Sequence, residues 1–589
     1  MKEFLKFTLA AIVGLILFSV LAVIFLLSTV SALVVSGEKP VSITENSVLV
    51  LKAGIPIPDR GNPFPFAGFD LTDLKLSPAP GLNDILTNLR KAAKDEKIKG
   101  VLIENGLSAP GWATTEEIRD ALSDFRKSGK FVIAYSDYVL LQEGYYLSTA
   151  ADRIYIDPAS SLDFKGLSGD VMFYKDALEK LGVVVQVTRV GKFKGAVEPF
   201  ILNGLSKDNE EQIRIYTMSI WNHALDNISK SRSIPVERLN MIADSLIGTI
   251  ASDALREGMV DGLLYRNDLI DTLKSLSGIK QDDKLYMVSM ARYSRVPEPQ
   301  KMVSAKNKIA VIYASGTIVM GKGNANNIGG NAFSDLIRKE RKDSLVKAIV
   351  LRVNSPGGNA VASDIMWKEL ELAAKVKPVV ISMGNYAASG GYYISAPGTK
   401  IFASPTTITG SIGVFGMIPD FEGLMTKKLG ITNQTVNTNK YSDFPSVFRP
   451  MGTYEKVVMQ SGIDKMYGEF VSKVAHGRKM RAPAVDSIAQ GRVWTGVDAK
   501  GIGLIDEFGG LKASVEAAAS LAGIETYSIR ELPALEDPYT RLMSQFSGDA
   551  RARLIRNELG EYSRYFDELQ EIREITGIQA RLPYFIEIH

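Results

Sequence analysis

The first half of this 589-residue sequence returns in its second half, and this repeat limits the possible folds more than any other feature. Four pairs of segments match in the same order: SVLVLKAGIPI with KIAVIYASGTI, LRKAAKDEKIKGVLIE with IRKERKDSLVKAIVLR, DYVLLQEGYYLSTAADRIYIDPAS with NYAASGGYYISAPGTKIFASPTT, and IASDALREGMVDGL with WTGVDAKGIGLIDEF. The spacing drifts only from 248 positions, between Lys99 and Lys347, to 245 positions, between Asp261 and Asp506. Chance similarities would not keep this order and spacing, so the sequence predicts two fused copies of one domain.

Within each copy, short runs rich in β-branched residues alternate with helical stretches. KAIVLRV, PVVISM and TKIFAS are typical of buried strands, whereas ASDIMWKELELAAKV is typical of a helix. This alternation predicts βαβ units, a largely parallel sheet and an α/β fold. We expect the two copies to span residues 46–298 and 299–531. Beyond them, RARLIRNELGEYSRYFDELQEIREI has the pattern of a long amphipathic helix and predicts a helical tail over residues 532–589.

The N-terminus carries an apolar segment, since no charged side chain occurs from Phe7 to Gly37. This run exceeds the ~20 residues that cross a bilayer as a helix. A cleaved signal peptide is the alternative, but its apolar core normally has ~7–15 residues. We therefore expect an uncleaved anchor over residues 1–38. Lys2 and Lys6 precede the span and favour a cytoplasmic N-terminus, which in a bacterium would put the rest of the chain on the periplasmic or extracellular side of the inner membrane.

Composition excludes several classes of chemistry. The sequence has no cysteine, so a cysteine nucleophile, a thiolate metal site and disulfides are ruled out. Its 69 basic and 66 acidic side chains give no concentrated positive field for nucleic acid. His223 and His476 lie in helical patterns without a glycine-rich turn, and no histidine or carboxylate pair has metal-ligand spacing. We expect no histidine triad, no metal, no cofactor and no nucleic-acid partner.

Two glycine-rich motifs in the second copy are suited to acyl chemistry. In NYAASGGYYIS, Ser389 precedes what looks like the first turn of a helix, where free N–H groups and the helix dipole favour a developing anion. In VNSPGGNAVAS, which follows the apolar strand KAIVLRV, exposed N–H groups near Gly358 could donate to a tetrahedral oxyanion. Each motif alone is also typical of an ordinary turn.

Together, NSPGG and AASGGYYIS resemble the long, duplicated form of bacterial signal peptide peptidase A, over both repeats and the N-terminal segment. The resemblance implies tandem ClpP/crotonase-like domains and a serine protease with a Ser-Lys dyad. It also implies that Ser389 is the nucleophile, that the N–H groups of Gly358 and Gly390 form the oxyanion hole, and that Lys194 in VGKFKGAVEPF is the general base. Ser411 in TGSIGVFG would support the lysine. A homotetramer and a substrate pool of signal peptides and short hydrophobic peptides are implied in the same way.

The repeat supports the choice of lysine. Aligning RVGKFKGAVEPF with NTNKYSDFPSVF puts Lys194 opposite Ser442, while Ser389 falls opposite Gln142. The first copy thus has the lysine without the serine and the second has the serine without the lysine, as one composite site would require. Burial beside apolar groups would lower the pKa of such a lysine and make it a base. Lys192 and Lys440 stay open as alternatives if this register is wrong by two positions.

The sequence therefore predicts a membrane-anchored serine endopeptidase that forms an acyl-enzyme on Ser389. Two other classes of function remain open. A crotonase-like fold can bind acyl-CoA thioesters through two backbone N–H groups, and a chain of this kind can also be an inactive membrane scaffold. The anchor and the serine between small residues favour the peptidase.

Overall fold

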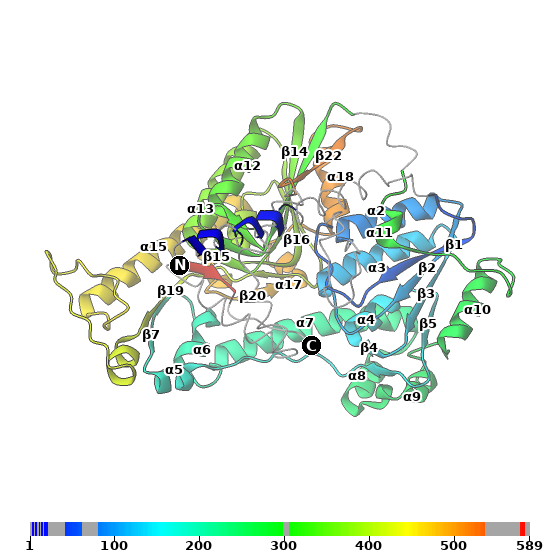
Figure 1. Cartoon of the computed structure of the whole chain (residues 1–589), viewed down its shortest axis with the longest axis horizontal. Coiled ribbons are helices and arrows are strands. Elements are labelled where there is room, and N and C mark those ends of the chain that lie inside the picture. The colour runs from blue at the N-terminus through cyan, green and yellow to red at the C-terminus, as the bar shows by residue number, and fades with distance from the viewer. Residues whose placement is uncertain are drawn as a thin grey trace.

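In the computed structural model, the described residues are 42–61, 80–297, 305–324, 326–535 and 578–582, together with part of the first 21 residues. Figure 1 shows the first half of the chain, coloured blue to green, beside the second half, coloured green to orange. Each half contains a central sheet with helices against it. The predicted α/β class is confirmed.

The sheet of the first half has six strands, all paired in parallel. Their order is β8 (Gly262–Leu263), β5 (Arg153–Ile156), β3 (Phe131–Ser136), β2 (Ile98–Glu104), β1 (Ser47–Lys52) and β9 (Met287–Ser289). The helices of this half are α2 (Leu82–Lys94), α3 (Trp112–Arg126), α4 (Gln142–Ser148), α5 (Lys175–Leu181), α6 (Glu198–Ile201), α7 (Lys207–Arg232), α8 (Val236–Ser245), α9 (Ala251–Arg256), α10 (Arg266–Leu276) and α11 (Met290–Tyr293).

The sheet of the second half is built in the same way. Its strands are β20 (Val493–Thr495), β18 (Ile408–Gly410), β16 (Val379–Ala388), β14 (Val346–Ser355), β10 (Lys308–Ser315) and β22 (Ser528–Leu532), with β17 (Lys400–Ala403) and β21 (Glu507–Phe508) beside β16. All these pairs are parallel except β18 with β20. The helices are α12 (Gly330–Lys342), α13 (Ala360–Ala374), α14 (Gly390–Ser395), α15 (Thr453–Arg478), α16 (Ala482–Ile488), α17 (Gly496–Gly501) and α18 (Leu511–Leu521).

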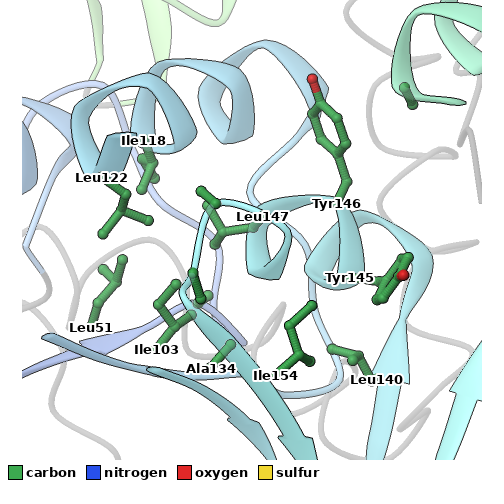
Figure 2. Close-up of a cluster of buried hydrophobic side chains, with 14 of the residues drawn as sticks. Leu51, Ile103, Ile118, Leu122, Ala134, Leu140, Tyr145, Tyr146, Leu147 and Ile154 are labelled. Atoms are coloured by element: carbon green, nitrogen blue, oxygen red, sulfur yellow. The ribbon is translucent and has the colours of Figure 1, made fainter. Parts of the chain in front are cut away.

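Both central sheets are buried on two faces. Along β10, Ile309 and Val311 pack toward α18, whereas Ala310 and Ile312 belong to the cluster under α12 and α13. This explains why the strands read as continuous apolar runs, since helices cover both faces of a parallel sheet. Figure 2 shows the equivalent layer of the first half, where side chains of α3 and α4 cover β1, β2, β3 and β5.

One polar contact recurs in both halves and supports the repeat in atomic terms. The Asp261 carboxylate accepts from the backbone N–H of Ile154 at 2.8 Å and pairs with Arg232, the last residue of α7, at 2.9 Å. In the second half, Asp506 accepts from Ile401 N–H at 2.7 Å and pairs with Arg478, the last residue of α15, at 2.6 Å. Asp261 and Asp506 are the aspartates that the sequence alignment paired.

A third sheet joins the two halves. Its order is β12 (Gly323–Asn324), β13 (Asn327–Gly329), β11 (Thr317–Val319), β15 (Gly357–Asn359), β23 (Ile578–Arg581), β19 (Phe415–Asp420) and β7 (Val184–Arg189). Strand β7 comes from the first half but pairs antiparallel with β19 of the second half. In Figure 1, β7, α5 and α6 lie near β19 at the lower left, and α7 runs from there back to the first half. A short sheet of β4 (Val139–Leu141) and β6 (Ser161–Asp163) completes the fold.

Both predicted terminal segments lie largely outside the described residues. For the expected anchor over residues 1–38, the described part of the chain contains no helix that is both long enough and apolar enough to cross a membrane. Most of the expected helical tail over residues 532–589 also lies outside the described residues. Where the tail is described, Ile578–Arg581 forms strand β23, so the prediction of helix is wrong for these residues. Pairing with β15 and β19 decides their conformation.

Candidate active site

Ser389 lies where strand β16 ends and helix α14 begins. Its backbone has φ 54° and ψ −112°, a conformation that a non-glycine residue rarely adopts. The Ser389 N–H donates to the Gly410 carbonyl at 2.8 Å, and its carbonyl accepts from the Tyr393 N–H at 2.8 Å, so the turn is fixed on both sides. The serine is fully buried. A strained turn held in this way aims the hydroxyl in one direction.

The side-chain amine of Lys194 contacts this serine across 195 positions of sequence. Nζ of Lys194 lies 2.8 Å from Oγ of Ser389 and 3.0 Å from Oγ of Ser411. The carbonyl oxygen of Ser411 is 3.2 Å away. The structure thus brings together three of the residues that the sequence singled out, one from the first half and two from the second.

The protonation state of Lys194 follows from its surroundings. The side chain is fully buried, and burial lowers its pKa well below the ordinary value of 10.5. Its three hydrogen-bonding partners, two hydroxyls and one carbonyl, are all uncharged. A neutral amine has a lone pair that can accept the proton of the serine hydroxyl.

The backbone before Lys194 is held by the second half. Strand β7 carries this segment along β19, and the Phe193 N–H then donates to the Gln490 carbonyl at 3.0 Å. Gly491 has φ +80°, and a Cβ added there would lie 2.7 Å from Cβ of Lys194. Only glycine at position 491 lets the two chains approach this closely.

A polar network on α6 and α7 supports the segment after Lys194, and the sequence analysis did not identify it. The buried Glu198 carboxylate accepts from Asn209 Nδ2 at 2.7 Å and from the Ser206 N–H at 3.1 Å. Gln212 donates to Asn209 at 3.0 Å and accepts from the Val493 N–H of the second half at 2.7 Å. A carboxylate in the otherwise apolar stretch GAVEPF was the available signal.

Gly358 and Gly390, the two glycines expected to donate to an oxyanion, lie on neighbouring turns. Gly390 is the first residue of α14, where the N–H has no partner within the helix. Gly358 lies in β15 with φ +153°, and a Cβ there would lie 2.1 Å from the Ile318 carbonyl oxygen. A Cβ on the intervening Gly357 would fall 2.7 Å from the Gly390 nitrogen. The Pro-Gly-Gly turn and the serine turn therefore touch.

The alternative lysines have other surroundings. Lys192 is exposed and lies 3.4 Å from Asp208. Lys440 stands over the Tyr441 ring at 5.1 Å in an exposed turn, next to Ser442, whose hydroxyl bonds to Asn439 at 3.0 Å. No contact joins either lysine to Ser389. The segment aligned with Lys194 in the second half therefore folds differently.

The histidines lie elsewhere in the described structure. His223 Nε2 is 3.2 Å from Glu116 Oε1 and 3.0 Å from Asn227 Nδ2, so it belongs to a network in the first half. His476 is exposed near the end of α15. Neither contacts Ser389. His589 lies outside the described residues. A buried serine beside a buried amine and a pair of glycine turns is a site suited to acyl transfer through a serine.

Comparison with known proteins agrees with this class of site. Peptidase family S49 matches residues 124–280 and 371–525, one match in each half. Protease 4 of Haemophilus influenzae is 37% identical over 448 residues, covering 74% of this chain and 72% of the relative. The chloroplastic serine protease SPPA of Arabidopsis thaliana is 32% identical, covering 85% and 74%. A putative signal peptide peptidase SppA of Enterococcus faecium is 39% identical over 178 residues, covering 30% of this chain and 52% of the relative.

The chain therefore belongs to peptidase family S49. It is a serine peptidase, and this membership favours peptide hydrolysis over the acyl-CoA and scaffold alternatives.

Proposed function

We propose that this chain is an endopeptidase in which Lys194 of the first half activates Ser389 of the second half. The observation that carries the proposal is the 2.8 Å contact between the fully buried amine and the serine hydroxyl. Lys194 takes the hydroxyl proton while Oγ attacks the substrate carbonyl, and then gives that proton to the leaving amine. The same amine next activates the water that releases the acyl group. Ser411 holds the amine through its hydroxyl and carbonyl oxygens.

The N–H groups of Gly358 and Gly390 stabilise the oxyanion of the tetrahedral intermediate in this proposal. Their support is the contact between the two turns and the position of Gly390 at the start of α14. Two preorganised donors in a site away from water are worth more than the same donors in water. Each half would have a ClpP/crotonase-like fold, with the site shared between the two copies.

The proposed substrates are cleaved signal peptides and other short apolar peptides. The support is the resemblance of NSPGG and AASGGYYIS to signal peptide peptidase A and the name of the Enterococcus faecium relative. We further propose that residues 1–38 anchor the chain as a single span in a bacterial inner membrane, with the catalytic part on the periplasmic or extracellular side. The uncharged run from Phe7 to Gly37 supports this. A homotetramer is proposed from the family resemblance alone.

The test is hydrolysis of an apolar fluorogenic peptide by purified wild type, Ser389→Ala and Lys194→Met. We expect kcat to fall by at least roughly 10³-fold in both variants, since loss of either member of a catalytic pair removes most of the acceleration. Lys192→Met and Lys440→Met are matched controls and should keep wild-type activity. Full activity in Lys194→Met, or loss of activity in Lys440→Met with unchanged thermal stability, would contradict the composite site.

A further inference from the structure

Strand β23, near the C-terminus, lies between the two strands that border the site. It pairs antiparallel with β15 on one side, where Ala580 is opposite Gly358, and antiparallel with β19 on the other, where Gln579 is opposite Phe415. Strand β15 carries the Pro-Gly-Gly turn, and β19 follows the loop that contains Ser411. An extended peptide that adds a strand between two edges is a recurrent way of binding peptides.

The carbonyl group of Ala580 points at the proposed oxyanion hole. The Leu582 N–H donates to the Pro356 carbonyl at 2.7 Å. Because hydrogen-bonded pairs alternate along an antiparallel ladder, the next such pair is Ala580 with Gly358, and the Ala580 carbonyl then faces the Gly358 N–H. A Cβ added to Gly357 would lie 2.1 Å from the Ala580 oxygen and 2.7 Å from the Gly390 nitrogen. The Ala580 oxygen and the Gly390 amide therefore crowd the same point.

The side chains around this carbonyl are seated in both halves of the protein. Ala580 is fully buried in the hydrophobic cluster of the second half, against which Ile578 also packs. Leu582, on the far side of Arg581, is 8% exposed and belongs to the cluster of the first half. Alternate side chains of an extended strand share one face, so residues 578, 580 and 582 form one apolar row. The residue nearest the turns is the smallest of the three.

We propose that β23 lies in the peptide-binding cleft as a substrate of its own chain, and that Ser389 cleaves the Ala580–Arg581 bond. The inference rests on the proposed function and adds a register and a preference to it. The residue before the cleaved bond must be small, because the Ala580 side chain is fully enclosed, and an aliphatic residue is favoured two positions earlier.

The step balances with the groups present. Oγ of Ser389 bonds to the carbonyl carbon of Ala580 as the hydroxyl proton passes to Lys194. The Ala580–Arg581 bond breaks, the Arg581 nitrogen receives that proton, and residues 581–589 leave as a nine-residue peptide. Water then hydrolyses the ester and leaves a new carboxyl group on Ala580. The cleft is thereby freed for other peptides.

Intact-mass measurement of the purified full-length chain tests the proposal. We expect wild type to end at Ala580 and Ser389→Ala to keep residue 589. Ala580→Gly keeps a small residue and should be cleaved at the same bond, whereas Ala580→Trp should keep the whole tail because the enclosed position has no room for an indole. Cleavage of Ser389→Ala, cleavage at another bond in wild type, or cleavage of Ala580→Trp after residue 580 would overturn the proposal.

Hydrolysis of the fluorogenic peptide by the same samples separates the two levels of the argument. Wild type that hydrolyses the peptide and yet keeps residues 581–589 would overturn self-cleavage alone. Wild type that does neither would overturn the proposed function as well.

Discussion

At the scale of residues, the central feature is a lysine kept in an environment that disfavours its charge. Lys194 is fully buried, and its amine touches two hydroxyls and a carbonyl but no carboxylate. Such a lysine weakens the fold, because the unfolded chain gains a proton that the folded chain refuses. Catalytic groups often carry this kind of strain between stability and activity.

The cost of burying Lys194 should depend on pH in a defined direction. Its pKa is lowered in the folded state, so the unfolded state binds more protons below 10.5 and stability rises with pH in that window. Lys194→Met removes this dependence. Between the folded-state pKa and 10.5, wild type should gain ~1.4 kcal/mol relative to Lys194→Met for each unit of pH.

Urea unfolding of both proteins at three pH values between 7 and 9.5 measures this difference. Lys192→Met, which removes an exposed lysine, should follow wild type. A stability difference between wild type and Lys194→Met that does not change with pH would show that the amine is charged when folded.

At the scale of elements, the position of Lys194 depends on how closely two loops pass each other. Gly491 has φ +80° and has Cβ of Lys194 at 2.7 Å from its missing side chain, whereas Gly503 has φ +79° and no neighbour within 4 Å. Both glycines would suffer a similar backbone strain of ~1–2 kcal/mol if replaced by alanine. Only the first replacement would also push the lysine.

Gly491→Ala should therefore lower kcat by about 10²-fold, since a displacement of about 1 Å in a catalytic group has effects of that size. Gly503→Ala should lose a similar amount of stability and keep its activity. Peptide hydrolysis and thermal melting of both variants check this. Equal activity in the two variants would mean that the approach at Gly491 does not position the amine.

The elements also show what the sequence could and could not predict. The strands and helices of both halves follow from local alternation, and Asp261 and Asp506 hold equivalent strands as the alignment required. The conformation of Ile578–Arg581 depends instead on β15 and β19, which are more than 150 positions away, so a helical pattern misled the prediction. Lys194 and Ser389 were paired by the repeat, and their atoms are 2.8 Å apart. Their roles stay predictions.

The network around Glu198 was beyond sequence reasoning for a similar reason. Its partners Asn209 and Gln212 are polar residues on a helix, and nothing local distinguishes them from exposed ones.

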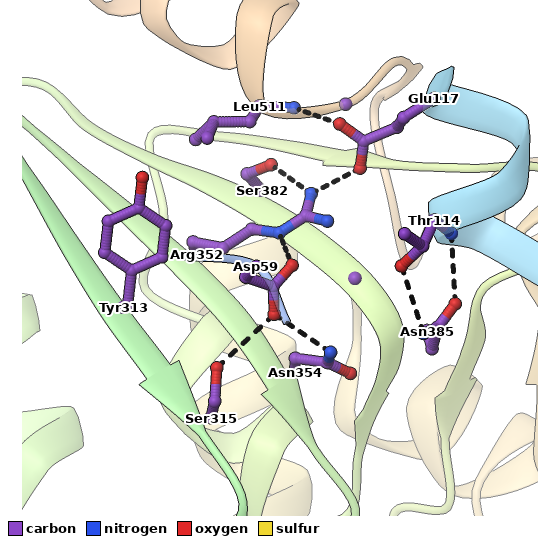
Figure 3. Close-up of polar contacts among 12 residues, drawn as sticks. Asp59, Thr114, Glu117, Tyr313, Ser315, Arg352, Asn354, Ser382, Asn385 and Leu511 are labelled. Atoms are coloured by element: carbon purple, nitrogen blue, oxygen red, sulfur yellow. Dashed lines mark hydrogen bonds and ion pairs between the residues drawn. The ribbon is translucent and has the colours of Figure 1, made fainter. Parts of the chain in front are cut away.

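At the scale of the whole molecule, the site requires the two halves to stay together. Figure 3 shows the strongest polar link between them, around Arg352 on β14. This fully buried guanidinium lies 2.7 Å from Asp59 and 2.6 Å from Glu117, both in the first half. Burial raises the pKa of Glu117, and the charge of Arg352 opposes that shift. The Glu117 carboxylate also accepts from the Leu511 N–H at 2.8 Å.

Arg352→Ala should cost about 3–5 kcal/mol of stability, because it leaves two buried carboxylates without their partner. Lys512→Ala is the matched control, since Lys512 also pairs with the first half, at 3.4 Å from Asp124, but on the surface. Its loss should cost no more than ~1 kcal/mol. Urea unfolding measures both. A cost below ~1 kcal/mol for Arg352→Ala would mean that the buried link does not hold the halves together.

The central claim is that an amine at position 194 of the first half activates Ser389 of the second. The sequence contains no cysteine, so Lys194→Cys carries a single thiol that can be alkylated in denaturant with 2-bromoethylamine and refolded. This treatment restores an amine at nearly the length of lysine. Wild type and Lys192→Cys are treated in parallel to measure recovery.

Peptide hydrolysis by the refolded Lys194→Cys protein is the measurement. We predict no activity before alkylation, recovery after 2-bromoethylamine, and no recovery after iodoacetamide, which adds an uncharged amide. Activity in unmodified Lys194→Cys, or no recovery with the amine when wild type and Lys192→Cys regain theirs, would contradict the composite site.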